Sequence, residues 1–147
     1  MPKLMLFAPC ERVIVEEGSN TVSLISLIQM LTASVPKGVD PKAIALQRWS
    51  VLTIWERESS DESKHFEQRI VVRDPNGSTA LEALAEFKVT RDFHRNIAMI
   101  EGFPLAVPGR YVLVLSLRET GQHDWAVLAD YPMTLKHATT PAEPISH

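Results

Sequence analysis

The sequence predicts an all-β single domain: an antiparallel β-sandwich of immunoglobulin-like character, with about eight strands and at most one short helical turn. Short runs of alternating apolar and polar residues recur along the 147 residues, separated by turn residues. Amphipathic helical periodicity is almost absent. Pro108-Gly109-Arg110-Tyr111 opens an apolar strand in the manner of the tyrosine corner of immunoglobulin-like domains. A barrel would suit the same strand pattern, and the residues leave that alternative open.

The first part of the chain predicts three strands. Two of them, 4–15 and 22–32, flank a turn at 17–20. The loop 34–41 holds two prolines and a glycine, which exclude regular structure. After it, residues 43–56 form a long strand that places Trp49 and Trp55 on the same face.

The middle of the chain predicts a hairpin and one ambiguous segment. Residues 65–73 alternate and stop at Asp74-Pro75-Asn76-Gly77, whose residue types favour chain reversal. Beyond it, apolar residues at helical spacing after Ser78, a potential N-cap, predict a short helical turn near 79–84. The alternation of Phe87 and Val89 then predicts a strand.

The last part predicts three more strands. Residues 97–103 form one of them, and residues 111–118 form a central strand that is apolar on both faces. The polar connector 118–124 contains Gly121 and leads into a strand over 125–137. Pro132 cannot donate a ladder hydrogen bond, so it indicates an edge position or a bulge there. We expect residues 1–137 to form the domain and 138–147 a disordered tail.

Composition narrows the class of protein. Apolar residues make up 45% and charged residues 22% of the chain, as in folded globular domains. The net charge of −3 and the lack of a basic stripe argue against a nucleic-acid partner. The apolar run 4–8 is too short for a secretory signal, and no stretch reaches the length of a membrane helix. The single cysteine, Cys10, excludes an internal disulfide and indicates a reducing cytoplasm.

Residues with catalytic or metal-binding chemistry are scattered. Cys10 could act as a nucleophile beside a histidine, but a free cysteine is more often a small buried core residue. The five histidines show no metal-ligand spacing, and the acidic stretch 56–62 suits a solvated turn better than a calcium site. The standard enzyme signatures are absent, which weighs against an enzyme. We therefore predict no catalytic, cofactor-binding or metal-binding residue.

Two sets of residues are candidates for an interaction surface. The first set is Trp49, Trp55 and Trp125, which would form an interface if exposed, although their apolar strands favour burial for at least two of them. The second set is Arg91, His94 and Arg95, which could bind an anion or an acidic partner or could simply be solvated.

Three segments together resemble a family of small, uncharacterised bacterial proteins, a domain of unknown function. They are FAPCERVIVEEGSNTVSLI near the start, DPNG in the middle and FPLAVPGRYVLVLSL toward the end, so the resemblance spans roughly residues 4 to 136. It implies a one-domain, sandwich-like cytoplasmic protein, and it carries over no activity and no site residues.

The function we expect is a non-enzymatic protein-interaction or structural module, with a protein partner or self-association, for example as a homodimer through an exposed edge strand. The alternative is a small-molecule-binding protein or metal-dependent enzyme with its site in the loops 56–65, 91–96 and 119–124. An interaction module should expose an apolar patch, whereas an enzyme should gather titratable groups in a concave pocket.

Overall fold

The computed structural model of the chain describes residues 1–34, 44–104 and 107–138, and these form nine strands in two sheets. The strands are β1 (Lys3–Val15), β2 (Val22–Leu27), β3 (Met30–Ala33), β4 (Ile44–Glu56), β5 (His65–Arg73), β6 (Thr79–Lys88), β7 (Phe93–Pro104), β8 (Gly109–Glu119) and β9 (Ala126–His137). The predicted all-β sandwich is confirmed. The predicted loop 34–41, beyond its first residue, and the tail from 139 onward lie outside the described residues.

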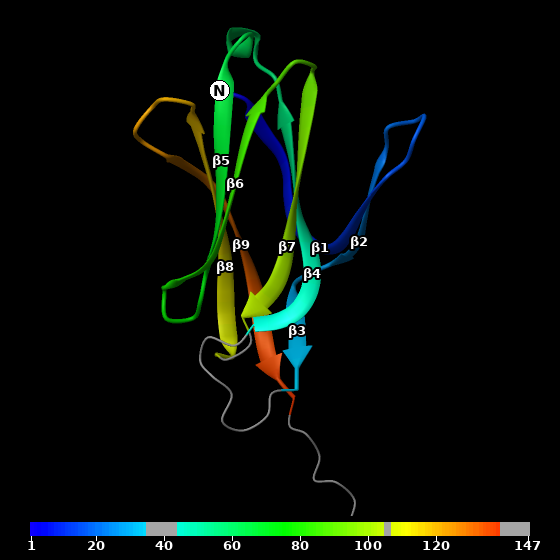
Figure 1. The fold of residues 1–147 in the computed structure, drawn as a ribbon, viewed down its shortest axis with the longest axis vertical. Coiled ribbons are helices and arrows are strands. Elements are labelled where there is room, and N and C mark those ends of the chain that lie inside the picture. The colour runs from blue at the N-terminus through cyan, green and yellow to red at the C-terminus, as the bar shows by residue number, and fades with distance from the viewer. Residues whose placement is uncertain (35–43, 105–106, 139–147) are drawn as a thin grey trace, which may run out of the picture.

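The two sheets pack face to face (Figure 1). One sheet has the strand order β2-β1-β4-β7, and the other has the order β3-β9-β8-β5-β6. All pairs are antiparallel except β3 with β9, which run parallel. Within the described residues, no helix has the length and apolar character needed to cross a membrane.

The core lies between the sheets because both central strands turn large apolar side chains inward. On β4, Trp49, Val51 and Trp55 are at most 1% exposed. On β8, every second residue from Tyr111 to Leu117 is equally buried, while Val112 and Val114 on the other face are only half-buried. The predicted central strand, apolar on both faces, is therefore confirmed.

Side-chain hydrogen bonds hold two local turns, and the predicted chain reversal after residues 65–73 is confirmed. The Tyr111 hydroxyl donates to the Val107 carbonyl at 2.6 Å, which fixes the entry to β8. At the hairpin between β5 and β6, Asp74 Oδ1 accepts the amides of Asn76 (2.9 Å) and Ser78 (3.0 Å). Gly77 supplies the positive φ, 84°, that this reversal requires.

The predicted single strand 22–32 is wrong, because the chain changes sheets within it. Ser26 has a φ of 56° within β2, but Leu27 after it still pairs with Cys10 of β1. Strand β2 ends at Leu27, and after Ile28 and Gln29 the chain enters β3 at Met30 beside β9. This division brings the strand count to nine.

The predicted helical turn near 79–84 is also wrong. Residues Thr79–Lys88 form the continuous strand β6, which pairs with β5 from Thr79 to Lys88. Strand pairing overrides the weak helical preference of its alanines and leucines. The one helical turn in the described residues is a 3-10 turn at Ser59–Asp61.

The outer face of the four-stranded sheet carries a small buried cluster of its own. Leu52 follows the inward-facing Val51, so it points to the opposite face, yet it is fully buried together with its neighbours Ala8 and Cys10. The β1–β2 hairpin projects from this side of the sandwich in Figure 1. Arg95 of β7 bonds to Asn20 at its tip, and this contact ties the hairpin to the sheet.

Pro132 lies at a sheet edge, as predicted. It is opposite Val112 of β8, whereas β3 pairs with β9 only from Thr134 onward. The Pro132 nitrogen, which carries no proton, thus costs the sheet no hydrogen bond.

Candidate interaction site

A groove opens along one side of the sandwich, between the last strands of the two sheets. Strand β6 ends the five-stranded sheet and β7 ends the four-stranded sheet. Two adjacent pockets of about 300 and 230 Å³ lie between them and share Ala83 and Met99. We call this surface, formed by residues 81–85 of β6 and 96–101 of β7, the open side.

Small side chains keep the open side from closing. Ala83 and Ala85 of β6 face Ile70 and Gln68 of β5 in the register, and Ala98 of β7 faces Val51. These alanines point toward the interior but are too short to fill the space between the sheets. The groove is consequently open at its rim. Ile70 and Val72 form its floor.

Large apolar side chains form the rim of the open side. Met99 is 74% exposed, Leu84 is 64% exposed and Ile97 is 37% exposed. Scattered apolar residues are normal on protein surfaces, but these three line one groove. Leu84 points to the outer side of the five-stranded sheet, and Ile97 and Met99 point to the outer side of the four-stranded sheet, so they border the groove from both sides. Exposed apolar residues gathered at one groove are typical of a surface that another molecule covers.

One end of the groove is polar. The buried Gln68 Oε1 accepts hydrogen bonds from the Thr53 hydroxyl (2.8 Å), the Trp55 indole (3.1 Å) and the Asn96 amide (2.9 Å). Gln68 and Asn96 both line the larger pocket. Three donors on one buried oxygen hold the side chains at this end of the groove in place.

His94 extends this network toward the end of the sandwich. Its Nε2 lies 2.8 Å from Asn96 Oδ1, and since the Asn96 amide donates to Gln68, the histidine nitrogen is the donor. The ring also stacks on Phe87 with centroids 4.9 Å apart. His94 is thus a packed, hydrogen-bonded residue between the sheets.

The structure places two of the three candidate tryptophans in the core. Trp49 is 1% exposed and its indole donates to the Gly102 carbonyl at 2.9 Å. Trp55 is fully buried and donates to Gln68. Burial of at least two tryptophans was the expectation from their apolar strands.

Trp125 lies on the outer face of the five-stranded sheet, and it does not line the open side. The guanidinium carbons of Arg69 and Arg118 lie 4.6 and 4.1 Å from its ring centroid. Arg118 also pairs with Glu67 at 2.9 Å. Trp125 is therefore already covered by two cations, as in cation–π contacts within proteins.

The structure does not bring Arg91, His94 and Arg95 together into one anion-binding site. Arg91 is exposed in the β6–β7 connection. His94 turns toward Phe87 in the interior, whereas Arg95, the next residue on the strand, points outward to Asn20. His94 and Arg95 thus point to opposite faces of the sheet.

The loops at the end of the sandwich were the alternative site. Asp61 is buried there, but its Oδ2 accepts the Glu58 amide at 2.9 Å in a capping box, and its Oδ1 lies 3.2 Å from the Met1 ammonium group. His123 and Asp124 are exposed in the β8–β9 connection. Among the described residues, no three His, Cys, Asp or Glu side chains are arranged to hold a metal.

Cys10 is fully buried on the outer face of the four-stranded sheet, as expected for a small apolar residue. Desolvation raises the pKa of its thiol, an effect partly offset by a backbone hydrogen bond involving Arg12. A buried thiol with a raised pKa is the opposite of an activated nucleophile.

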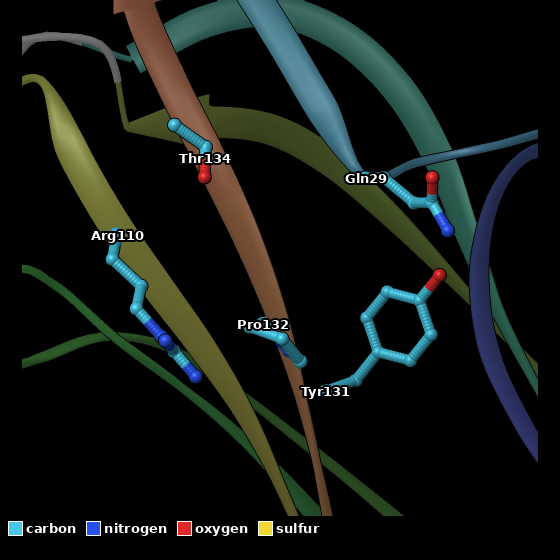
Figure 2. Close-up of a pocket in the computed structure, with 5 residues that line it drawn as sticks. All are labelled: Gln29, Arg110, Tyr131, Pro132 and Thr134. Atoms are coloured by element: carbon cyan, nitrogen blue, oxygen red, sulfur yellow. The ribbon is translucent and has the colours of Figure 1, made fainter.

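A further pocket of about 430 Å³ lies at β9, near the part of its edge that β3 leaves free (Figure 2). Its polar groups do not converge. In Figure 2 the Arg110 guanidinium lies on one side of β9, and the Tyr131 hydroxyl and Gln29 lie on the other. The pocket is a shallow fold of the surface around a strand edge rather than a cavity with gathered functional groups.

Sequence reasoning missed the residues that make the open side. The signal available was the alternation of alanines on β6, at positions 83 and 85, where a strand of the core would carry larger side chains. The three-donor network on Gln68 had no sequence signal, because its members come from three different strands.

Comparison with protein-family models and with curated proteins finds no match for this chain. The resemblance to small bacterial proteins of unknown function therefore stays a prediction.

Proposed function

We propose that the chain is a non-enzymatic protein-interaction module that binds an extended polypeptide strand at its open side. The observation that carries this proposal is the groove between β6 and β7, lined by alanines and rimmed by Met99, Leu84 and Ile97. Both strands also end their sheets, so each offers a row of backbone donors and acceptors. A strand added to such an edge gains backbone hydrogen bonds, while the groove takes its alternate side chains.

We also propose that the sandwich is immunoglobulin-like. It is supported by the corner contact of Tyr111 and by the neighbours β1-β4-β7 and β9-β8-β5, which match the A-B-E and G-F-C order of such domains. In the constant-type arrangement a further strand, D, lies next to strand E in its sheet. The counterpart of strand E here is β7, and the edge of β7 that faces away from β4 has no strand beside it among the described residues.

A cytoplasmic location is also part of the proposal. It rests on the chemistry of Cys10, a single buried thiol with no disulfide partner, which suits a reducing compartment.

Selection from a displayed library of random twelve-residue peptides tests the binding function. The chain is used at a concentration at which sedimentation shows it to be monomeric, so that its own copies do not occupy the surface. We expect enriched peptides with alternating apolar residues, whose binding Met99→Lys abolishes. The matched control is Val127→Lys, since Val127 is also a large exposed apolar residue, 66% exposed, but lies on β9. Failure to enrich any peptide, or binders that tolerate Met99→Lys, would overturn the proposal.

A further inference from the structure

We infer that the strand bound at the open side is β7 of a second copy of this chain, in a two-fold dimer with Ala98 opposite Ala98. This inference rests on the proposed function and names its partner. The two four-stranded sheets would join edge to edge, and the interface would use the same patch on both copies.

Strand β7 has the regular backbone that edge pairing needs. It pairs with β4 without interruption from Phe93 to Glu101, and its only proline is the terminal Pro104. Natural proteins usually protect a free edge with a bulge, a proline or an unmatched charge. Between Phe93 and Glu101, β7 has neither a bulge nor a proline.

The charges on β7 are complementary to β7 itself in one register. Its outward-facing residues are Phe93, Arg95, Ile97, Met99 and Glu101. When Ala98 lies opposite Ala98 of the second copy, Arg95 lies opposite Glu101 and Ile97 lies opposite Met99. The two-fold axis repeats each pair, so two ion pairs flank two apolar pairs.

Neighbouring registers lose this match. Moving the centre to Ile97 places Arg95 opposite Met99 and Phe93 opposite Glu101. Moving it to Met99 places Ile97 opposite Glu101. Each shift places a charge opposite an apolar side chain, so Arg95 and Glu101 select the register centred on Ala98.

Both charged side chains are available for these pairs. Arg95 uses one Nη1 and one Nη2 contact to Asn20, and a guanidinium group has five N–H donors. Glu101 pairs with Arg48 at 3.1 Å, but both side chains are at least three-quarters exposed, and solvent screens such a pair.

The other strand of the open side does not match itself in this way. Centring β6 on Leu84 places Glu82 opposite Glu86, which is repulsive. The register that joins Glu82 to Lys88 instead places Leu84 opposite Glu86. Neither of these registers of β6 satisfies its charges and its exposed leucine together, which favours β7 as the pairing edge.

Sedimentation velocity on charge-reversed variants tests the dimer. The native chain should show a concentration-dependent dimer. Arg95→Glu and Glu101→Arg should each raise its dissociation constant at least about tenfold, because each substitution sets like charges opposite one another at two places. An equimolar mixture of the two variants should restore the dimer, since every reversed charge then meets an opposite charge on the other variant.

Two controls separate pairing from folding. Asn20→Ala and Arg48→Ala remove the present partners of Arg95 and Glu101, and both should leave the dimer intact. Circular dichroism establishes that each variant is folded, and the mixing result itself requires folded chains.

A monomeric native chain, or a mixture that stays monomeric, overturns the dimer. If Met99-dependent peptide binding persists in that case, the proposed function still stands. A dimer that is insensitive to both charge reversals also overturns the inference. If Met99→Lys leaves both that dimer and peptide binding unchanged, the proposed function fails as well.

Discussion

Replacing Gln68 with leucine should destabilise the fold strongly, although the change in volume is small. Gln68 Oε1 is the acceptor for three donors at 2.8, 2.9 and 3.1 Å. The Gln68→Leu substitution removes that acceptor, and a buried donor left without a partner costs about 1–3 kcal/mol.

The three donors differ in what they lose. Trp55 is fully buried, so its indole N–H bears the full penalty. The Thr53 hydroxyl keeps a second, longer contact to the Asn96 carbonyl at 3.4 Å. Asn96 is half-buried and lines the groove, where water can reach its amide. The free energy of unfolding should therefore fall by about 2–4 kcal/mol.

Equilibrium unfolding in urea, followed by tryptophan fluorescence, measures this loss, with an unchanged m value as the sign that the fold is retained. Thr53→Val in the same background completes a double-mutant cycle. The double variant should be about 1 kcal/mol more stable than the sum of the single effects predicts, because the valine no longer has an unpaired hydroxyl. A loss below about 1 kcal/mol for Gln68→Leu, or strict additivity, would mean that Gln68 is not a shared acceptor on which the three donors depend.

Three further predictions concern the frame of the sandwich. Tyr111→Phe removes the corner hydrogen bond to Val107 and should cost about 1 kcal/mol in urea unfolding, whereas an unchanged midpoint would contradict a role for that bond. Gly109→Ala should cost about 1–3 kcal/mol, because Gly109 has a φ of 135° and an added Cβ would lie 3.0 Å from Pro75 Cγ; a neutral effect would show that this turn relaxes freely. Cys10 should react with a thiol reagent far more slowly in the folded chain than in urea. Because burial raises the pKa of its thiol above its ordinary value, the folded state holds this proton at a higher pH than the unfolded state. Its contribution to stability is thus present below the unfolded pKa and declines as the pH rises toward the folded pKa, and Cys10→Ala should flatten that alkaline decline.

The sequence allowed the sandwich and its central strands to be predicted, because periodicity reports which face of a strand is buried. The inward face of β8 and the turn after β5 followed directly from alternation and from turn chemistry. The division of 22–32 did not follow, because the chain changes sheets at Ile28 and Gln29, which are not turn-forming residue types. The strand at 79–88 was hidden by helix-favouring residues whose conformation is decided by pairing with β5.

The candidate site was less predictable than the fold. The tryptophans and the cluster at 91–95 were chosen by residue type, but interaction surfaces depend on what a strand leaves uncovered, which is a property of sheet order. Of the chosen residues, His94 and Arg95 lie on β7 itself, and only the strand order shows that β7 ends its sheet. The apolar partners Ile97 and Met99 were within a predicted strand, where their exposure could not be foreseen.

Amide hydrogen exchange measured by mass spectrometry over a series of protein concentrations tests whether the chain associates through the edge of β7 that has no strand beside it among the described residues. We predict that exchange in Phe93–Glu101 slows as the concentration rises, while the edges of β2 and of β9 before Thr134 exchange at a constant rate. Constant exchange in β7, with protection appearing at another edge or nowhere, would contradict it.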